Sequence, residues 1–217
     1  MIESYSFYPI DSRMYVIIEN SKALIIDPCI SDEAKESLQE NHVKEINVIL
    51  THGHYDHISG VNWLREHFSD VNVICQEEAA RACGKPNKNL SSFYEILFMG
   101  KDEATQEYVH NMKLPPYSCE VDQTFVGGFE MNWEGHHVCL KETPGHSKGS
   151  ICILFDEEIL FSGDTLVTGH DTITRLPGGS KKDFMEKTIP FLKSLDGERM
   201  VYPGHGEPQR LREFKYF

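Results

Sequence analysis

Short hydrophobic runs recur along the first third of the chain, and polar segments with helical spacing separate them. Five such runs predict β-strands, namely Ile2–Phe7, Met14–Ile18, Ala23–Ile26, Ile46–Leu50 and Val71–Cys75. Amphipathic spacing predicts helices over Ser31–Glu40 and Ile58–Phe68. Strands and helices that alternate in this way place the chain in the α/β class.

The second half of the chain follows the same logic. Its apolar runs predict four further strands, Val138–Lys141, Ser150–Phe155, Ile159–Phe161 and Met200–Tyr202. Ser180 is a typical helix N-cap and predicts a helix over Lys181–Leu195. With 217 residues the chain is long enough for one substantial core and short for two. We therefore expect a single domain over residues 1–217.

Residues 84–123 fit the alternation poorly and indicate an insertion. The segment is rich in aromatic residues, namely Phe93, Tyr94, Phe98, Tyr108 and Tyr117. Aromatic residues at helical spacing are typical of packing in the core or at a dimer contact. They also suit a lid that excludes water from a site and selects its substrate. Both interpretations, including a homodimer, stay open at this point.

The strongest chemical signal is the segment His52-Gly53-His54-Tyr55-Asp56-His57, directly after the predicted strand Ile46–Leu50. Imidazole nitrogens and carboxylate oxygens are ligands suited to zinc, iron or manganese. In a turn that leaves a strand, His52 and His54 can converge on one ion, and Asp56 and His57 can face a second. The segment therefore predicts a metal site.

Three further ligand-capable residues stand where a predicted strand gives way to a turn that contains glycine. They are His146 in Pro144-Gly145-His146, Asp164 in Gly163-Asp164-Thr165 and His205 in Gly204-His205-Gly206. Loops over a rigid sheet commonly build functional sites. We expect these residues to complete the metal site.

The order His-x-His-x-Asp-His, Pro-Gly-His, Gly-Asp-Thr and Gly-His-Gly resembles the metallo-β-lactamase fold superfamily, and within it the glyoxalase II-like hydrolases. The resemblance extends from about Tyr15 to His205. It implies an αββα sandwich, in which two mixed sheets pack together between outer helices.

The resemblance also implies a role for each motif residue. The first metal would be held by His52, His54 and His146, the second by Asp56, His57 and His205, and Asp164 would bridge both. Asp27 resembles an aspartate that steadies the ligand loop from behind, although a strand-ending turn explains it equally well. The cofactors would be two divalent ions, zinc first, with iron or manganese as alternatives.

Such a constellation predicts hydrolysis by a metal-bridging hydroxide, because two ions lower the pKa of a shared water and stabilise the developing oxyanion. Asp56 would orient or accept the proton of that water. Many true β-lactamases of the superfamily resemble each other in lacking a carboxylate at the bridging position, so Asp164 favours thioester, ester or lactone substrates. Only residues 206–217 follow His205, so the region with which glyoxalase II grips glutathione is not expected here.

Several alternatives remain on sequence alone. A mononuclear iron persulfide dioxygenase would use only His52, His54 and His146. A lactone or β-lactam hydrolase would use both metals, and a non-enzymatic protein would use metal to hold a binding surface.

Three residues are weaker candidates for contact with substrate. Tyr55 either orients substrate or packs in the core. His170, six residues beyond Asp164, is a candidate for the pocket wall. Arg175 either binds a carboxylate or phosphate through its planar guanidinium or is a solvated surface residue.

Composition narrows the partners. A formal net charge of −13 disfavours nucleic acid and anionic membranes, since both reward a basic surface. We expect a small-molecule substrate. No secretion signal or membrane-length apolar run is visible, and the six cysteines lie singly without Cys-x-x-Cys spacing. These features predict reduced thiols and a cytoplasmic enzyme.

Overall fold

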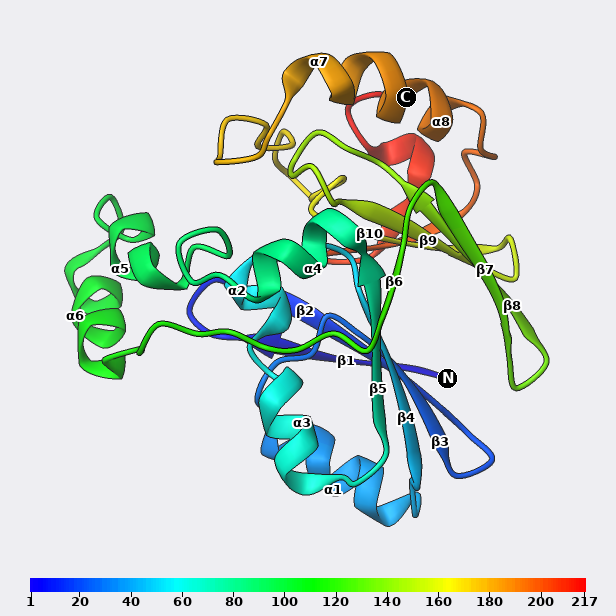
Figure 1. The fold of residues 1–217 in the computed structure, drawn as a ribbon. Helices are drawn as coiled ribbons and strands as arrows, with labels where there is room; N and C mark the ends of the chain where they lie inside the picture. The colour runs from blue at the N-terminus through cyan, green and yellow to red at the C-terminus, as the bar shows by residue number, and fades with distance from the viewer.

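The computed structural model describes residues 1–217 and contains two six-stranded sheets (Figure 1). The first sheet has the strand order β1 (Ile2–Phe7), β2 (Ser12–Glu19), β3 (Lys22–Ile26), β4 (Glu45–Leu50), β5 (Val71–Gln76) and β6 (Gln123–Phe125). Strands β1 to β3 pair antiparallel, whereas β3 to β6 pair parallel. Both pairing types occur in one sheet, so the sheet is mixed, as the resemblance implied.

The second sheet has the order β12 (Gln209–Arg210), β11 (Met200–Pro203), β10 (Ile159–Gly163), β9 (Ile151–Phe155), β8 (His136–Glu142) and β7 (Gly128–Trp133). Only β10 and β11 pair parallel, and the other neighbours are antiparallel. Because β10 and β11 run in the same direction, their carboxyl ends carry Asp164 and His205 to the same edge of the sheet.

Side-chain alternation along the strands builds three hydrophobic layers. Leu24 and Ile26 of β3 join the cluster between the two sheets, where they meet residues such as Val138 and Phe161. Ile25 points to the opposite face and packs in the cluster beneath α1 (Asp32–Glu40) and α3 (Val61–His67). A third cluster lies under α7 (Lys181–Asp183) and α8 (Ile189–Lys193). The layers confirm the predicted αββα sandwich.

Two predicted helices differ from their expected form. The helix predicted over Ile58–Phe68 is shortened to α3, because the pair Ser59-Gly60 separates α3 from the short helix α2 (Tyr55–Ile58), to which Ile58 belongs. A Cβ at Gly60 would lie 2.7 Å from the carbonyl carbon of Cys29, so only glycine permits this approach. The second helix, predicted over Lys181–Leu195, contains the π-helical segment Phe184–Thr188 between α7 and α8.

The segment predicted as an insertion ends one residue earlier than expected, because Gln123 already belongs to β6. It contains a 3₁₀ turn (Ser91–Phe93), α5 (Tyr94–Leu97) and α6 (Glu103–Met112). Helices α5 and α6 project sideways from the sandwich in Figure 1. No helix of the chain is long and apolar enough to cross a bilayer.

The aromatic residues of this segment divide into two groups. Tyr94 and Phe98 are buried in the same cluster that lies beneath α1 and α3, whereas Phe93 and Tyr108 are each 45% exposed. The buried pair therefore anchors the segment to the core, and only the exposed residues are available for a lid or a contact.

Candidate metal centre

The motif that begins at His52 lies at the carboxyl end of β4, between the parallel strands β3 and β5. Thr51 to His54 form the turn, and His54 is the N-cap of the short helix α2. Every polar residue of the motif is buried, with exposures of 1% for His52, 5% for His54, 8% for Asp56 and 0% for His57. Because buried polar groups require partners, we expect these side chains to contact one another or a bound ion.

The first cluster consists of three imidazoles. His54 Nδ1 lies 3.1 Å from His52 Nε2 and 2.9 Å from His146 Nε2. The outer nitrogens of two of these rings have fixed partners. His146 Nδ1 donates to the carbonyl of Ile173 at 2.9 Å, and His52 Nδ1 lies 3.1 Å from Thr51 Oγ1.

These partners determine where the protons are. Thr51 Oγ1 donates its own proton to Asp27, so it accepts from His52 Nδ1. The inward nitrogens of His52 and His146 are therefore lone pairs in the neutral rings. The single Nδ1 of His54 can donate to only one of them. One lone pair stays unmatched without a cation, and a metal ion satisfies all three.

The second cluster combines imidazoles and carboxylates. His57 Nε2 lies 3.2 Å from Asp56 Oδ2, and His205 Nε2 lies 3.5 Å from the same oxygen. His57 Nδ1 faces Asp27 Oδ2 at 2.9 Å, and His205 Nδ1 donates to the carbonyl of Ile10 at 3.1 Å. When the rings are neutral, as in a metal ligand, both therefore turn an acceptor nitrogen toward the cluster, and buried His57 Nε2 has no hydrogen-bond partner. Such an orphaned acceptor beside a carboxylate fits a bound cation.

Asp164 lies between the two clusters. Its Oδ1 is 3.2 Å from His57 Nε2 and 3.3 Å from His205 Nε2, and its Oδ2 is 3.4 Å from His146 Nε2. Oδ1 is also buried without a hydrogen bond. Each carboxylate oxygen thus faces a different cluster, which is the geometry that a bridging ligand needs.

The electrostatics of the clusters differ. Burial and the neighbouring imidazoles lower the pKa of His54 to about 3, and burial also lowers the pKa of His52 and His146. At neutral pH the three imidazole rings are therefore uncharged, and each has one nitrogen with a free lone pair, as a metal ligand must have. Burial alone would lower the pKa of His205, but the carboxylates of Asp164 and Asp56 outweigh it and raise the pKa to about 10.

The carboxylates respond in the opposite direction. Burial on its own would raise the pKa of Asp56 and of Asp164, but the surrounding imidazoles hold both well below their usual value. The pKa of His57 is raised, because Asp56, Asp164 and Asp27 together outweigh its burial. The second cluster therefore attracts positive charge strongly, whether protons or metal ions supply it.

Asp27 supports both clusters from behind. Its Oδ1 accepts from the backbone N–H of Thr51 at 2.7 Å, and its Oδ2 accepts from Thr51 Oγ1 at 2.5 Å and from His57 Nδ1 at 2.9 Å. Although Asp27, His52 and His57 also lie close enough together to form a ligand set, these three donors occupy its oxygens. The contacts favour the supporting role over the simple turn.

The Asp27→Asn variant is expected to bind metal about 10- to 100-fold more weakly, the usual effect of removing a group that orients metal ligands. An amide at this position cannot accept from both Thr51 and His57 in the same way, so the ring of His57 loses its fixed proton. Titration of the purified variant with zinc measures the change. Exposed Asp70→Asn is the matched control. If Asp27→Asn bound zinc as tightly as this control, the supporting role would be refuted.

Two glycines that the sequence interpretation treated only as turn residues prove to be part of the site. A Cβ at Gly204 would lie 2.3 Å from Asp164 Oδ1 and 2.9 Å from His57 Cε1. Gly163 has a φ of +47°, and its Cβ would lie 2.3 Å from Thr51 Oγ1. A side chain at Gly204 would displace two candidate ligands, and one at Gly163 would displace Thr51, whose hydroxyl donates to Asp27.

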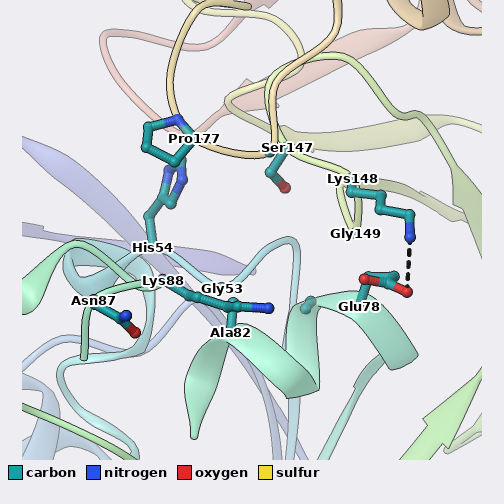
Figure 2. A pocket seen from close by; sticks show the side chains of 12 residues that line it. Gly53, His54, Glu78, Ala82, Asn87, Lys88, Ser147, Lys148, Gly149 and Pro177 are labelled. Carbon is teal, nitrogen blue, oxygen red and sulfur yellow. Dashed lines mark ion pairs between the residues drawn. The ribbon is translucent and has the colours of Figure 1, made fainter. Parts of the chain in front are cut away.

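A cleft of about 370 Å³ opens beside His54 (Figure 2). Its walls come from the motif turn, from α4 (Glu77–Cys83), from the start of the 84–123 segment and from two turns of the second half. The lining residues are Gly53, His54, Glu78, Ala79, Ala82, Asn87, Lys88, Ser147, Lys148, Gly149, Pro177 and Gly178. Lys88 and Lys148 were not predicted from sequence.

The three weaker candidates are not brought to this cleft. Tyr55 packs at 5.2 Å from Tyr94 and 5.3 Å from Tyr117, measured between ring centroids. The structure thus favours packing for Tyr55. His170 is exposed and borders a separate depression, and Arg175 is exposed and has no ion pair.

Comparison with known proteins identifies the family. The model of the metallo-beta-lactamase superfamily matches residues 8–205, and the chain belongs to that superfamily. A probable metallo-hydrolase of Methanocaldococcus jannaschii is 29% identical over 100% of this chain and 98% of its own length. A hydroxyacylglutathione hydrolase of Francisella philomiragia is 26% identical, and the match covers 92% of this chain but only 65% of that protein.

Solved structures agree with this placement. The B3 metallo-beta-lactamase BLEG-1 superposes with a TM-score of 0.77 at 25% identity, covering 98% of this chain and 95% of its own. The protein TTHA1623, crystallised in a di-iron-bound form, gives a TM-score of 0.69 at 25% identity, covering 97% and 95%. Both the predicted family and the predicted fold are confirmed, and the chain's relatives include probable metal-dependent hydrolases.

Proposed function

We propose that this protein is a dinuclear metal-dependent hydrolase of small acyl thioesters or esters. The observation that carries the proposal is the complete set of seven ligand groups in two clusters that share Asp164. Membership of the superfamily and the probable metallo-hydrolase among the relatives support the coarser assignment to metal-dependent hydrolysis. The carboxylate at the bridging position favours thioesters and esters over β-lactams.

Divalent ions at the two clusters would polarise the scissile carbonyl and lower the pKa of a bound water from 15.7 to about 7. The residues of the chain supply the rest. Asp56 is ionised at neutral pH, and its Oδ2 faces the centre of the second cluster, where it can orient or accept a proton from the attacking water. The Asp27–Thr51 contacts hold the ligand turn rigid, so little reorganisation is needed during the reaction.

A mononuclear iron oxygenase would require only His52, His54 and His146. The second cluster is equally complete and only His205 in it is partly exposed, and its orphaned acceptors have no role in such an enzyme. We therefore favour two metals, zinc first, with iron or manganese also compatible with nitrogen and carboxylate ligands.

The decisive experiment is metal analysis of protein purified without added metal, followed by a substrate panel. We expect about two metal equivalents per chain and hydrolysis of thioesters of simple thiols, as a two-metal site implies. One iron per chain with oxygen uptake on a persulfide would contradict the proposal. Within the panel, we expect glutathione thioesters to be favoured by less than about 100-fold over esters of simpler thiols.

The 84–123 segment gives a separate prediction on substrate choice, because its exposed and buried aromatics differ. Phe98 is 2% exposed, so Phe98→Ala is expected to cost about 3–5 kcal/mol of stability and to depress all substrates alike. Exposed Phe93→Ala is expected to keep stability and metal content but to change relative rates among substrates, as a lid residue would. Thermal denaturation and the same substrate panel measure both. Unchanged relative rates in Phe93→Ala would argue against a lid.

A further inference from the structure

The cleft beside His54 carries net positive charge in a strongly acidic chain. Its lining includes two lysines, Lys88 and Lys148, and one acidic residue, Glu78, which gives 2 − 1 = +1. The whole chain has a formal net charge of −13. A positive cleft on an acidic protein concentrates anions at that point and repels them elsewhere.

Lys88 is the unpaired cation of this cleft. Its ammonium group forms no ion pair, although its charge contributes to lowering the pKa of Glu78. In Figure 2 its side chain extends across the floor of the cleft, past Gly53 and Ala82, toward the side on which Glu78 lies. An ammonium group in this position is available to a ligand that enters the cleft.

Lys148 is paired, but the pair can be exchanged. Its Nζ lies 2.9 Å from Glu78 Oε1, and its side chain is 70% exposed, so solvent screens the pair and it contributes little to stability. Glu78 is also held by Arg81 at 2.6 Å. If Lys148 turns to a ligand, Glu78 therefore keeps a cationic partner and its charge stays compensated.

The backbone beside Lys148 adds neutral donors. The N–H groups of Lys148 and Gly149 donate to no carbonyl of the protein, whereas the neighbouring Ser147 N–H is bonded to Ser150 Oγ at 3.1 Å. A Cβ at Gly149 would lie 2.3 Å from the backbone nitrogen of Ala79, so this turn is pressed against α4. The two free N–H groups therefore lie on a rigid wall of the cleft.

We propose that this cleft is a subsite for an anionic group of the substrate, a carboxylate or a phosphate, which Lys88 and Lys148 bind. The inference rests on the proposed hydrolase function and specifies its substrate class. His54 belongs both to the first metal cluster and to the cleft wall. A thioester whose carbonyl lies over the metal clusters can therefore place a charged end in the cleft.

The test uses matched substrates with the metal-loaded enzyme. Acetyl thioesters of 3-mercaptopropionate, of 2-mercaptoethyl phosphate and of uncharged 3-mercaptopropionamide place a carboxylate, a phosphate or no charge on the thiol side. Succinyl and succinamoyl thioesters of a neutral thiol make the same comparison on the acyl side. We expect kcat/KM to favour one of the anionic substrates over its neutral match by about tenfold. The substrate with the higher kcat/KM shows whether the cleft binds a carboxylate or a phosphate, and whether that group belongs to the thiol part or the acyl part of the thioester.

Three variants and a control assign that preference to the cleft. Lys88→Gln and Lys148→Gln should each reduce the ratio of anionic to neutral kcat/KM by about threefold or more, and Glu78→Gln should increase it, because the cleft then gains positive charge. Exposed Lys44→Gln, which removes a lysine outside the cleft, should leave the ratio unchanged. The preference should also fall with added salt, since both lysines are solvent-accessible.

A binding readout separates this inference from the chemistry. Ethanesulfonate is a weak metal ligand, and it should inhibit wild-type enzyme competitively and Lys88→Gln more weakly. Equal rates on charged and neutral substrates, with lysine variants that match wild type, would overturn the anionic subsite while hydrolysis itself stands. Failure of metal-loaded wild type to cleave any of these thioesters would overturn the proposed function instead.

Discussion

The His205→Ala variant is expected to retain the first metal, lose the second and lose hydrolysis by about 10²- to 10³-fold, the scale on which electrostatic groups at a reaction centre contribute. His205 Nε2 faces both Asp56 and Asp164. The only other imidazole of the second cluster, His57, is itself a candidate ligand and cannot replace it. His52, His54 and His146 do not depend on it. Metal content by mass spectrometry and kcat/KM on the best thioester of the panel measure the result.

Two further variants make this result specific. His205 also donates to the carbonyl of Ile10, so His205→Asn, which keeps a hydrogen-bond donor, separates loss of metal from loss of folding. His110→Ala removes a histidine with a 73% exposed side chain and should behave as wild type. If His205→Ala kept both metal equivalents and the full rate, His205 would not be a ligand.

The positions of the ligand turns could be predicted because the signals are local. Residues Ile46–Leu50 are continuously buried, and the His52 motif follows them directly, so the sequence itself shows a buried strand followed by a polar turn. His146, Asp164 and His205 also follow strand-like runs. The division of ligands between two clusters came from the family resemblance, and the geometry agrees with it.

Other features depend on contacts between distant residues. Asp27 reaches Thr51 and His57 because the parallel register of β3 and β4 places Ile26 opposite Ile49. Lys88 and Lys148 come together only because the turn at Gly149 packs on Ala79 of α4. No pattern in the sequence contains those distances, so neither arrangement could be predicted.

One missed element did carry a local signal. Strand β7 (Gly128–Trp133) alternates between exposed and more buried positions, with Phe129, Met131 and Trp133 pointing inward. Its polar residues lie on the exposed face of the strand, opposite the face that packs between the sheets. The period of two is visible in the sequence, but the run is too polar to stand out among apolar strands.

Chelation of the metals is expected to make the stability of the protein depend strongly on pH above neutrality. Without metal, the raised pKa of His205, about 10, means that its protonated ring pairs with Asp56 and Asp164 in the folded chain. A raised pKa contributes stability that is fully present below the unfolded value of about 6.5 and is lost as pH rises through the folded value. His57 acts in the same direction, because its pKa is also raised.

The first cluster has the opposite effect on the pH dependence of stability. His54, with a pKa of about 3, stays neutral in the folded chain, so its stabilising contribution rises as pH increases toward 6.5. His52 and His146 follow, because their pKa values are lowered too. The melting temperature of the chelated protein should therefore be highest near pH 6.5 and should fall between about pH 6.5 and 10.

Metal ions should remove the alkaline decline, because they replace the protons as the positive charge of the second cluster. Metal at about 1,000 times its Kd adds about 4 kcal/mol, and a chain of this size gains roughly 2–4 °C per kcal/mol, so we expect a difference on the order of 10 °C. That difference should widen from pH 6.5 to 10. Burial raises the pKa of a thiol such as Cys29 to about 12, above this range, so such thiols do not cause the decline between pH 6.5 and 10. Thermal denaturation of loaded and chelated protein across this range decides the matter. A chelated protein whose melting temperature does not change between pH 6.5 and 10 would show that the second cluster does not hold protons in place of metal.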